Sequence, residues 1–257
     1  MQILIYLSRV FDIPPDNVKK QGKILSIGVC NRYNKSVETL EAMNRNGDFG
    51  NIYHVYCSFR SFRSIPGLGG DFTTKTQSGG GVLIDWGVHF LDLILYILGG
   101  AKLVNATADA YCEMAKDMKS YKYKSMWAED TADFENGTND VDDFITGHIR
   151  TDKASISFNG AWAQNVGQSE MFIDILGDKG GARLSYGNQF TFWDGATLEN
   201  FTSEHEIPNM YAKQDKAFLS SIETGVKDKS HIDYVLESAR LLDALYASSE
   251  ENKELYF

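Results

Sequence analysis

The sequence predicts an α+β (α/β) fold, a large and mostly antiparallel open sheet with helices packed on one face. Three observations predict it. Short segments rich in β-branched and aromatic residues follow one another between turn signals, which is typical of an antiparallel meander. Segments with apolar residues at helical spacing flank them. The length of 257 residues is sufficient for one large core or two small ones.

Composition and charge exclude several classes of function. Hydrophobic residues make up 43% and charged residues 23%, as in ordinary globular proteins. The net charge of -10 argues against sequence-independent nucleic-acid binding, which needs a basic surface. Cys30, Cys57 and Cys112 are far apart and lack CxxC spacing, so they suggest neither a disulfide framework nor a zinc site. We expect a reduced, cytoplasmic setting.

The first third of the chain reads as strand, helix and strand. Its first residues, MQILIYLSRVFD, lack the basic start and cleavage site of a signal peptide. Residues 22–33 form an apolar run that fits a buried strand. Residues 34–50 place apolar side chains at helical intervals and stop at Asn46-Gly47, and residues 51–62 alternate as a strand does.

The middle of the chain predicts six further strands. They lie near residues 102–113, 140–150, 154–163, 169–177, 181–187 and 189–193. The segment 169–177 has apolar residues on both faces. We therefore expect helices to cover one face of the sheet and a partner subunit to cover the other.

Two helices are predicted to close the chain. One runs over about 208–223 and stops at Thr224-Gly225. The next starts at Ser230, with Asp233 three residues on, in a variant of the capping box.

The apolar run 82–98 contains three ionisable residues. It is shorter than the roughly 20 residues of a membrane span, so we expect a buried helix and no membrane partner. At about 100° per residue, Asp85, His89 and Asp92 share one narrow stripe. Because burying unpaired charges is costly, this stripe must face water, its own members or a ligand.

Three interpretations of this stripe remain open from the residues alone. Asp85 and His89 at i, i+4 can share a hydrogen bond that suits the imidazole to proton transfer. The stripe can instead be a satisfied polar strip that only orders loops. A metal site is disfavoured, because no further His or Cys lies nearby in sequence. The run Gly79–Gly81 lacks the pattern of a P-loop or a dinucleotide fold, so it predicts a tight backbone turn.

Several strings, in order along the chain, carry a resemblance to a known family. They are NRYNKSVETLEAMNRNGDFGNIYHVYCSFR, GGGVLIDWGVHFLDLILYILGG, FNGAWAQN, FIDILGDKGGARLSYG and SHIDYVLESARLLDALYASSE. From about residue 24 onward the chain resembles the glucose-fructose oxidoreductase / inositol dehydrogenase / rhizopine-catabolism (Gfo/Idh/MocA) family. The resemblance implies a Rossmann domain that binds NAD or NADP and an α/β domain whose open sheet mediates oligomerisation. It also implies redox chemistry at a ring hydroxyl or carbonyl of sugars and cyclitols.

The resemblance also implies site residues. The family's D-x-x-x-H pattern falls on Asp85 and His89, which implies that His89 is the catalytic acid/base and that Asp85 positions it. The candidate substrate-binding residues are Arg32, Lys75, Asp92, Trp162 and Asn165. Three of them have a plainer interpretation: Arg32 can pair with an acidic neighbour, Lys75 can be a solvated loop residue and Trp162 can belong to the core.

The beginning of the sequence departs from the family pattern. The first 23 residues contain neither G-x-G-x-x-G nor E-K-P, and only GKILSIGVCNR resembles the last part of a nucleotide domain. We therefore expect residues 1–31 to be a leader and a remnant of the dinucleotide-binding domain. Residues 32–257 are expected to be the substrate-binding and oligomerisation domain. The chain alone is then expected to bind neither NAD nor NADP.

Two functions are compatible with these expectations. The chain is a truncated member of an NAD(P)-dependent sugar or cyclitol oxidoreductase family, with His89 as acid/base. The alternative is a non-catalytic sugar-binding or oligomeric assembly protein that has lost cofactor binding. Both imply a small sugar or cyclitol ligand and a homo-oligomer formed through the open sheet.

Overall fold

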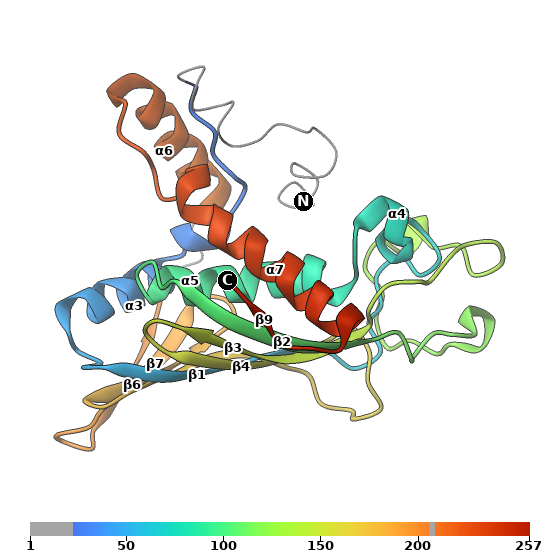
Figure 1. Ribbon diagram of the computed structural model, residues 1–257, viewed down its shortest axis with the longest axis horizontal. Helices are drawn as coiled ribbons and strands as arrows, with labels where there is room; N and C mark the ends of the chain where they lie inside the picture. Colours follow the sequence, from blue (N-terminus) through green and yellow to red (C-terminus); the bar gives the residue numbers. More distant parts are fainter. Residues whose placement is uncertain (1–22, 206–208) are drawn as a thin grey trace.

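A nine-stranded sheet forms the base of the computed structural model, which describes residues 23–205 and 209–257 (Figure 1). Its strands are β1 (Ile52–Arg60), β2 (Leu103–Tyr111), β3 (Phe144–Thr151), β4 (Ser155–Ala161), β5 (Glu170–Gly177), β6 (Gly180–Ser185), β7 (Gln189–Asp194), β8 (Asn200–Glu204) and β9 (Leu255–Tyr256). Their order is β8-β7-β6-β5-β1-β4-β3-β2-β9, and β1 with β4 is the parallel pair among them. The predicted open, mostly antiparallel sheet is confirmed.

The helices gather on one side of this sheet, as predicted. They are α3 (Lys35–Asn46), α4 (Lys75–Ser78), α5 (Val88–Ile97), α6 (Met210–Thr224) and α7 (Ile232–Glu251). Figure 1 shows α3, α5 and α7 over the sheet and α6 projecting from that layer. Short 3₁₀ helices span Cys30–Tyr33, Asp71–Thr73, Met118–Ser120 and Glu129–Thr131, and a π turn spans Leu83–Gly87.

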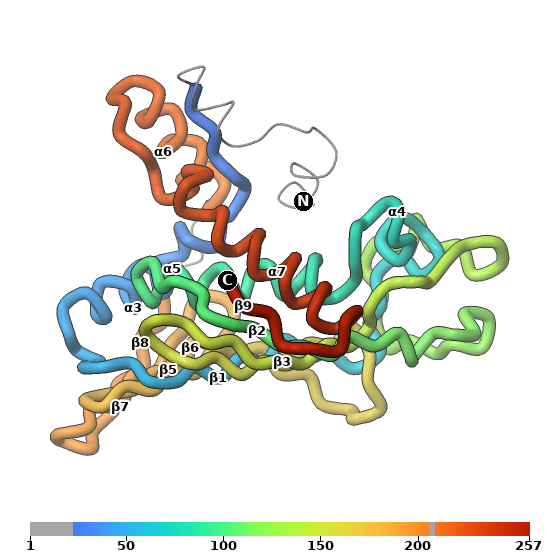
Figure 2. Tube along the Cα trace, viewed as in Figure 1, coloured from blue at the N-terminus to red at the C-terminus, as the bar shows by residue number. Residues whose placement is uncertain are grey.

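The prediction of a strand over residues 22–33 is wrong for its described part, 23–33. A single bridge joins Ser26 to His231, and Cys30–Tyr33 is a 3₁₀ helix. The backbone of residues 25–27 bonds to residues 230–232 just before α7, and the two stretches run side by side in Figure 2. Ile27 and Val29 are buried in a small cluster with Ile232 and Val235. The apolar pattern of this segment therefore reflects its burial against the start of α7, and the segment does not pair as a strand of the sheet.

The other predicted elements are present, with small differences at their ends. The helix over 34–50 is α3, which ends at Gly47 in the left-handed conformation. The start predicted for α7 is wrong, because its N-cap is His231, whose ring accepts from the Asp233 amide. The Ser230 hydroxyl donates instead to the Tyr33 hydroxyl. Strands β8 and β9 were not predicted, since β8 carries no buried residue and β9 has only two residues.

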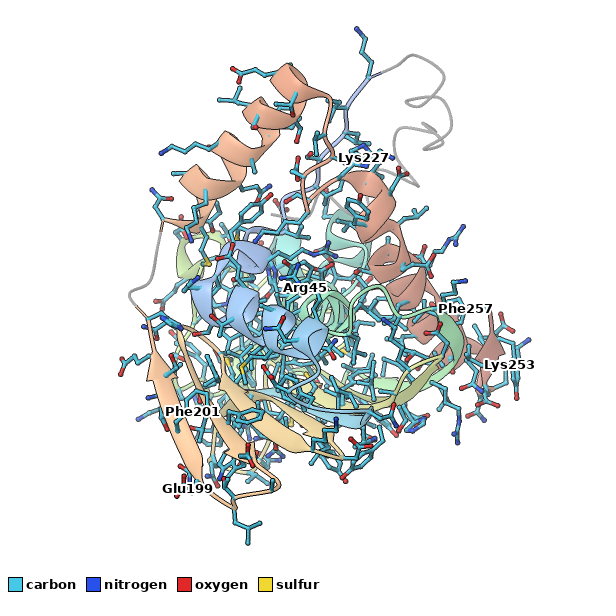
Figure 3. All side chains as sticks on the ribbon, turned by 90° about the vertical axis from the view of Figure 1, so that its left-hand side faces the viewer. Arg45, Glu199, Phe201, Lys227, Lys253 and Phe257 are labelled. Atoms are coloured by element: carbon cyan, nitrogen blue, oxygen red, sulfur yellow. The ribbon has the colours of Figure 1, made fainter. Side chains whose placement is uncertain are left out.

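The main core fills the layer between the sheet and the helices. Figure 3 shows side chains crowded into this layer, with Phe201 on β8 near one edge. The opposite face of the sheet is largely polar: the strand register aligns Tyr56, Ser157 and Asp174 there, and Arg183 pairs with Asp174. The prediction of apolar residues on both faces of β5 holds in part. Phe172 lies on the polar face, under the Arg183 guanidinium at 4.2 Å.

The glycine run before the π turn is explained by close packing. A Cβ on Gly80 would lie 2.2 Å from the Tyr246 hydroxyl, and one on Gly81 would lie 1.9 Å from the Asp142 carbonyl oxygen. The Asp142 carboxylate accepts from the amides of Gly81 at 2.7 Å and Leu83 at 3.0 Å, so it caps the start of the π turn that leads into α5. The predicted tight turn is confirmed, and protein atoms occupy the space that a phosphate would need.

Replacing Gly81 with alanine is expected to destabilise the fold by about 1–3 kcal/mol, because the new methyl group overpacks against backbone. Urea unfolding of the two proteins measures this difference. Gly167→Ala is the matched control, since nothing lies within 4 Å of its added Cβ. Equal unfolding midpoints for the two variants would contradict the packing described for this turn.

Candidate functional site

The stretch Lys75–Ile97 is apolar and long enough, at 23 residues, to qualify as a membrane span by hydropathy. Within the protein it is a core segment, since 78% of its most apolar window is buried. It is also broken, because α4 ends at Gly79 in the left-handed conformation. Burial inside the fold therefore accounts for its hydropathy.

A π turn over Leu83–Gly87 precedes α5 and separates the polar residues that the sequence places on one stripe. A π turn contains i→i+5 bonds, so residues before and after it do not keep α-helical spacing, and such turns are frequent at functional sites. Among the side-chain hydrogen bonds of the described residues, none joins Asp85 to His89. The predicted i, i+4 bond is therefore absent, and the three residues face three different neighbours.

Asp85 faces the indole of Trp162. The Trp162 Nε1–H donates to Asp85 Oδ2 at 3.0 Å, from a tryptophan that is fully buried at the end of β4. Burial raises the pKa of Asp85 from 3.8 to about 6, and the Trp162 bond opposes part of that rise. Asp85 is therefore a carboxyl group whose ionised form is disfavoured at its position.

Replacing Asp85 with asparagine is expected to stabilise the fold at pH 7.5 by about 1–3 kcal/mol, following the size of the pKa shift. The folded pKa lies above the unfolded one, so wild-type stability is lost as pH rises from 3.8 to about 6. The amide stays neutral and can still accept from Trp162. Urea unfolding at pH 4 and pH 7.5 is the measurement. The increase in unfolding free energy of the variant should be present at pH 7.5 and small at pH 4. The opposite order would contradict the raised pKa of Asp85.

His89 lines a pocket of about 300 Å³. No hydrogen bond to its ring is found among the described residues, whose side chains therefore leave the ring exposed to this pocket. Burial lowers the pKa of His89, and the nearby Asp92 carboxylate opposes part of that effect. At neutral pH the imidazole is therefore uncharged, with one nitrogen able to accept a proton.

Arg32 and Asp92 form a buried ion pair behind this pocket. The Arg32 Nε donates to Asp92 Oδ2 at 2.8 Å and Nη2 donates to Oδ1 at 2.6 Å, with exposed side-chain fractions of 2% and 3%. The Ser238 hydroxyl also donates to Asp92, and the remaining Arg32 donors reach the carbonyls of Lys229 and Tyr234. These contacts match the plainer interpretation of Arg32 and leave its donors engaged within the protein.

The structure does not bring Lys75 and Asn165 to His89. Lys75 lines a separate pocket and pairs with Glu250 at 3.0 Å. Asn165 is exposed and accepts from Arg63. Of the sequence candidates, Asp85 and Trp162 contact each other, Arg32 and Asp92 contact each other, and His89 alone lines the pocket of about 300 Å³.

Sequence reasoning missed most of the pocket wall. Asn31 comes from the 3₁₀ helix, Tyr186 from the turn after β6 and Tyr211 from α6. These residues are far apart in sequence, and nothing in their spacing signals that they meet. Across residues 23–205 and 209–257, no group of three or more His, Cys, Asp or Glu side chains is arranged to hold a metal ion.

Solved structures share this fold. Aldose-aldose oxidoreductase from Caulobacter crescentus, complexed with glycerol, matches with a TM-score of 0.75 and 18% identity over 94% of this chain and 66% of that chain. Levoglucosan dehydrogenase, in complex with NADH and levoglucosan, matches with a TM-score of 0.77 and 15% identity over 94% of this chain and 68% of that chain. At such identities the likeness concerns the fold.

Sequence comparison gives the family. D-glucoside 3-dehydrogenase of Escherichia coli (strain K12) is 26% identical over 240 residues, which are 91% of this chain and 65% of that protein. The chain thus spans just under two thirds of this relative's length. The family model described as GFO/IDH/MocA C-terminal domain matches residues 37–183, more than half of the chain. The chain belongs to the Gfo/Idh/MocA family, a family of sugar oxidoreductases.

Proposed function

We propose that this chain supplies the sugar-binding pocket and the proton-transfer residue of an NAD(P)-dependent sugar or cyclitol oxidoreductase. The observation that carries the proposal is His89, an uncharged imidazole with no hydrogen-bond partner among the described residues, in a pocket of ligand size. A positioned histidine is the commonest general base in proteins. The relative named as a D-glucoside 3-dehydrogenase supports a sugar as the ligand.

In this proposal the chain's own residues bind the ring and move one proton. A substrate hydroxyl donates to a nitrogen of the His89 ring and transfers its proton there, while the hydride on the same carbon would pass to the NAD(P)⁺ that the whole oxidoreductase would hold, so that the carbonyl forms. In the reverse direction the same nitrogen returns the proton. Asp85 lies within the π turn that precedes α5, where Trp162 donates a hydrogen bond to its carboxyl group.

The described residues do not fit a whole nicotinamide dinucleotide. Such a cofactor needs a glycine-rich phosphate turn between a parallel strand and a helix start. Gly79–Gly81 does not serve, because Tyr246 and Asp142 fill the space beside it and Asp142 already caps the helix amides. The pocket of about 300 Å³ is of a size for a single ring. We accordingly keep the proposal that residues 23–205 and 209–257 by themselves bind no NAD or NADP.

We also propose that the chain forms a cytoplasmic homo-oligomer through the polar face of its sheet. Tyr56, Tyr111 and Trp193 share that face and are 51%, 46% and 44% exposed. Exposed aromatics are enriched at subunit interfaces. The described cysteines Cys30, Cys57 and Cys112 are free, which supports a reducing compartment.

Light scattering at micromolar concentration is expected to give a dimer or tetramer. Tyr56→Glu is expected to shift the population towards monomer, because it adds a charge at the centre of the sheet. Tyr123→Glu, which places the same charge at an exposed position outside the sheet, should not. A monomeric wild-type protein would contradict the proposed interface.

Two measurements test the proposed function. The purified chain is titrated with NADH and NADPH, and NAD(P)⁺ reduction with neutral sugars is then assayed after a separate nucleotide-binding domain of a family member is added. Turnover that needs His89 supports the oxidoreductase. Sugar binding with neither nucleotide binding nor turnover would instead favour the alternative, a non-catalytic sugar-binding protein. Tight nucleotide binding would contradict the expectation that the chain alone lacks a cofactor site.

A further inference from the structure

The size of the pocket beside His89 limits what it can hold. Its volume is about 300 Å³, the lower end of the range for small-molecule pockets, which is about 300–1,000 Å³. Its described wall includes Asn31, His89, Tyr186 and Met210. One sugar ring fills such a space, and a nucleotide-linked sugar exceeds it.

The charge of the pocket limits the ligand further. Among the described residues that line it, none is a lysine, arginine, aspartate or glutamate. Two cations of the described residues near this region are engaged within the protein: Arg32 pairs with Asp92, and the Lys229 ammonium lies 2.6 Å from Glu38. A phosphate or carboxylate buried in this pocket would therefore meet no cationic side chain among the described lining residues, and burying an unpaired anion costs several kcal/mol.

Tyr186 gives the pocket an aromatic surface. Its ring stacks on Phe90 with centroids 4.5 Å apart and an interplanar angle of 20°. The Asn31 side-chain amide donates to the Tyr186 hydroxyl at 3.1 Å, so ring and hydroxyl are both held in place. The side chain is still 41% exposed. It presents an apolar ring and a polar end, which together suit the apolar face and the hydroxyl groups of a pyranose.

We propose that this pocket selects a single uncharged sugar ring, with Tyr186 as the residue that determines this specificity, and that it rejects sugar phosphates, uronates and nucleotide-linked sugars. The inference rests on the proposed function only for the placement of the reacting hydroxyl at His89. The selection itself follows from the volume, the absence of charged side chains among the described lining residues, and the stacked tyrosine.

Ligand-observed NMR titration of the full chain tests the inference. The probes are methyl β-D-glucopyranoside, glucose 6-phosphate and glucuronate. The neutral glucoside should bind at least tenfold more tightly than either anion. Tyr186→Ala should weaken glucoside binding about tenfold, whereas Tyr123→Ala should not, although Tyr123 is also 41% exposed. Met210→Lys, which adds a cation to the wall, should raise the affinity for glucose 6-phosphate about tenfold.

Three results would overturn the inference: anions that bind as tightly as the glucoside, unchanged glucoside binding in Tyr186→Ala, or no binding of any neutral sugar. Its failure is distinguishable from failure of the proposed function. Turnover of a sugar phosphate that needs His89 would overturn the neutral selection and keep the oxidoreductase. Neutral sugar binding that needs Tyr186, in a chain without turnover, would keep the neutral selection and overturn the proposed oxidoreductase function.

Discussion

Replacing Asp92 with asparagine is expected to destabilise the fold by about 3–5 kcal/mol, the range for breaking a buried ion pair at one partner. The large effect follows from burial, since Arg32 and Asp92 are 2% and 3% exposed. The guanidinium would lose its carboxylate while remaining enclosed by α5, α7 and the ring of Tyr96, which it faces at 5.2 Å. Urea unfolding at pH 7 measures the loss.

Two controls separate this buried pair from an ordinary surface pair. Glu113→Gln removes the exposed pair with Lys116 and should change stability by less than about 1 kcal/mol. The double variant Arg32→Met, Asp92→Leu removes both charges and should recover much of the loss. A loss for Asp92→Asn as small as that for Glu113→Gln would show that the pair does not anchor α5.

Replacing His89 with glutamine is expected to lower sugar turnover by about 10²–10⁴, the usual contribution of a general base. Steady-state reduction of the nicotinamide nucleotide measures it, in an assay that supplies the nucleotide-binding domain of a family member as a separate chain. The wild-type rate should fall at low pH with an apparent pKa below the ordinary value of 6.5, because burial disfavours the charged imidazole. His148→Gln is the matched control, since His148 lies on the polar face of the sheet.

Retention of full turnover by His89→Gln would remove His89 from the reaction. A fall in rate at low pH with an apparent pKa above the ordinary histidine value would also contradict the buried environment described for its ring. A loss of turnover with unchanged sugar affinity would fit proton transfer best, because the ring then acts on the reaction and not on binding.

Much of the fold follows from local patterns in the sequence. Segments such as 169–177 and 189–193 carry β-branched and aromatic residues between turn signals, and they become β5 and β7. Residues 22–33 carry a similar apolar pattern, yet from Lys23 they pack against the start of α7. Periodicity indicates which side chains are buried and does not reveal what buries them, so a buried coil and a buried strand look alike.

The site was predictable in part, and the reasons are geometric. Asp85, His89 and Asp92 stand out because charges in an apolar run require partners. Their partners Trp162 and Arg32 are 77 and 60 residues away along the chain, so only the tertiary fold assigns them. A helical wheel cannot reveal the π turn at Leu83–Gly87, because it assumes the same rotation for every residue. Tyr186 could not be predicted for the same reason. The topology of the sheet brings it to the pocket, and its position in the sequence does not show this.

The most direct test of the account is a long-range ¹H–¹⁵N NMR spectrum of the histidine rings during titration with methyl β-D-glucopyranoside. The chain has five histidines, so the ring signals can be assigned by single substitutions. The account predicts that the sugar shifts the His89 ring signals in a saturable way, that Tyr186→Ala weakens this response, and that the His148 signals stay unchanged. A sugar that binds without any response at His89 would contradict the claim that this histidine faces the ligand.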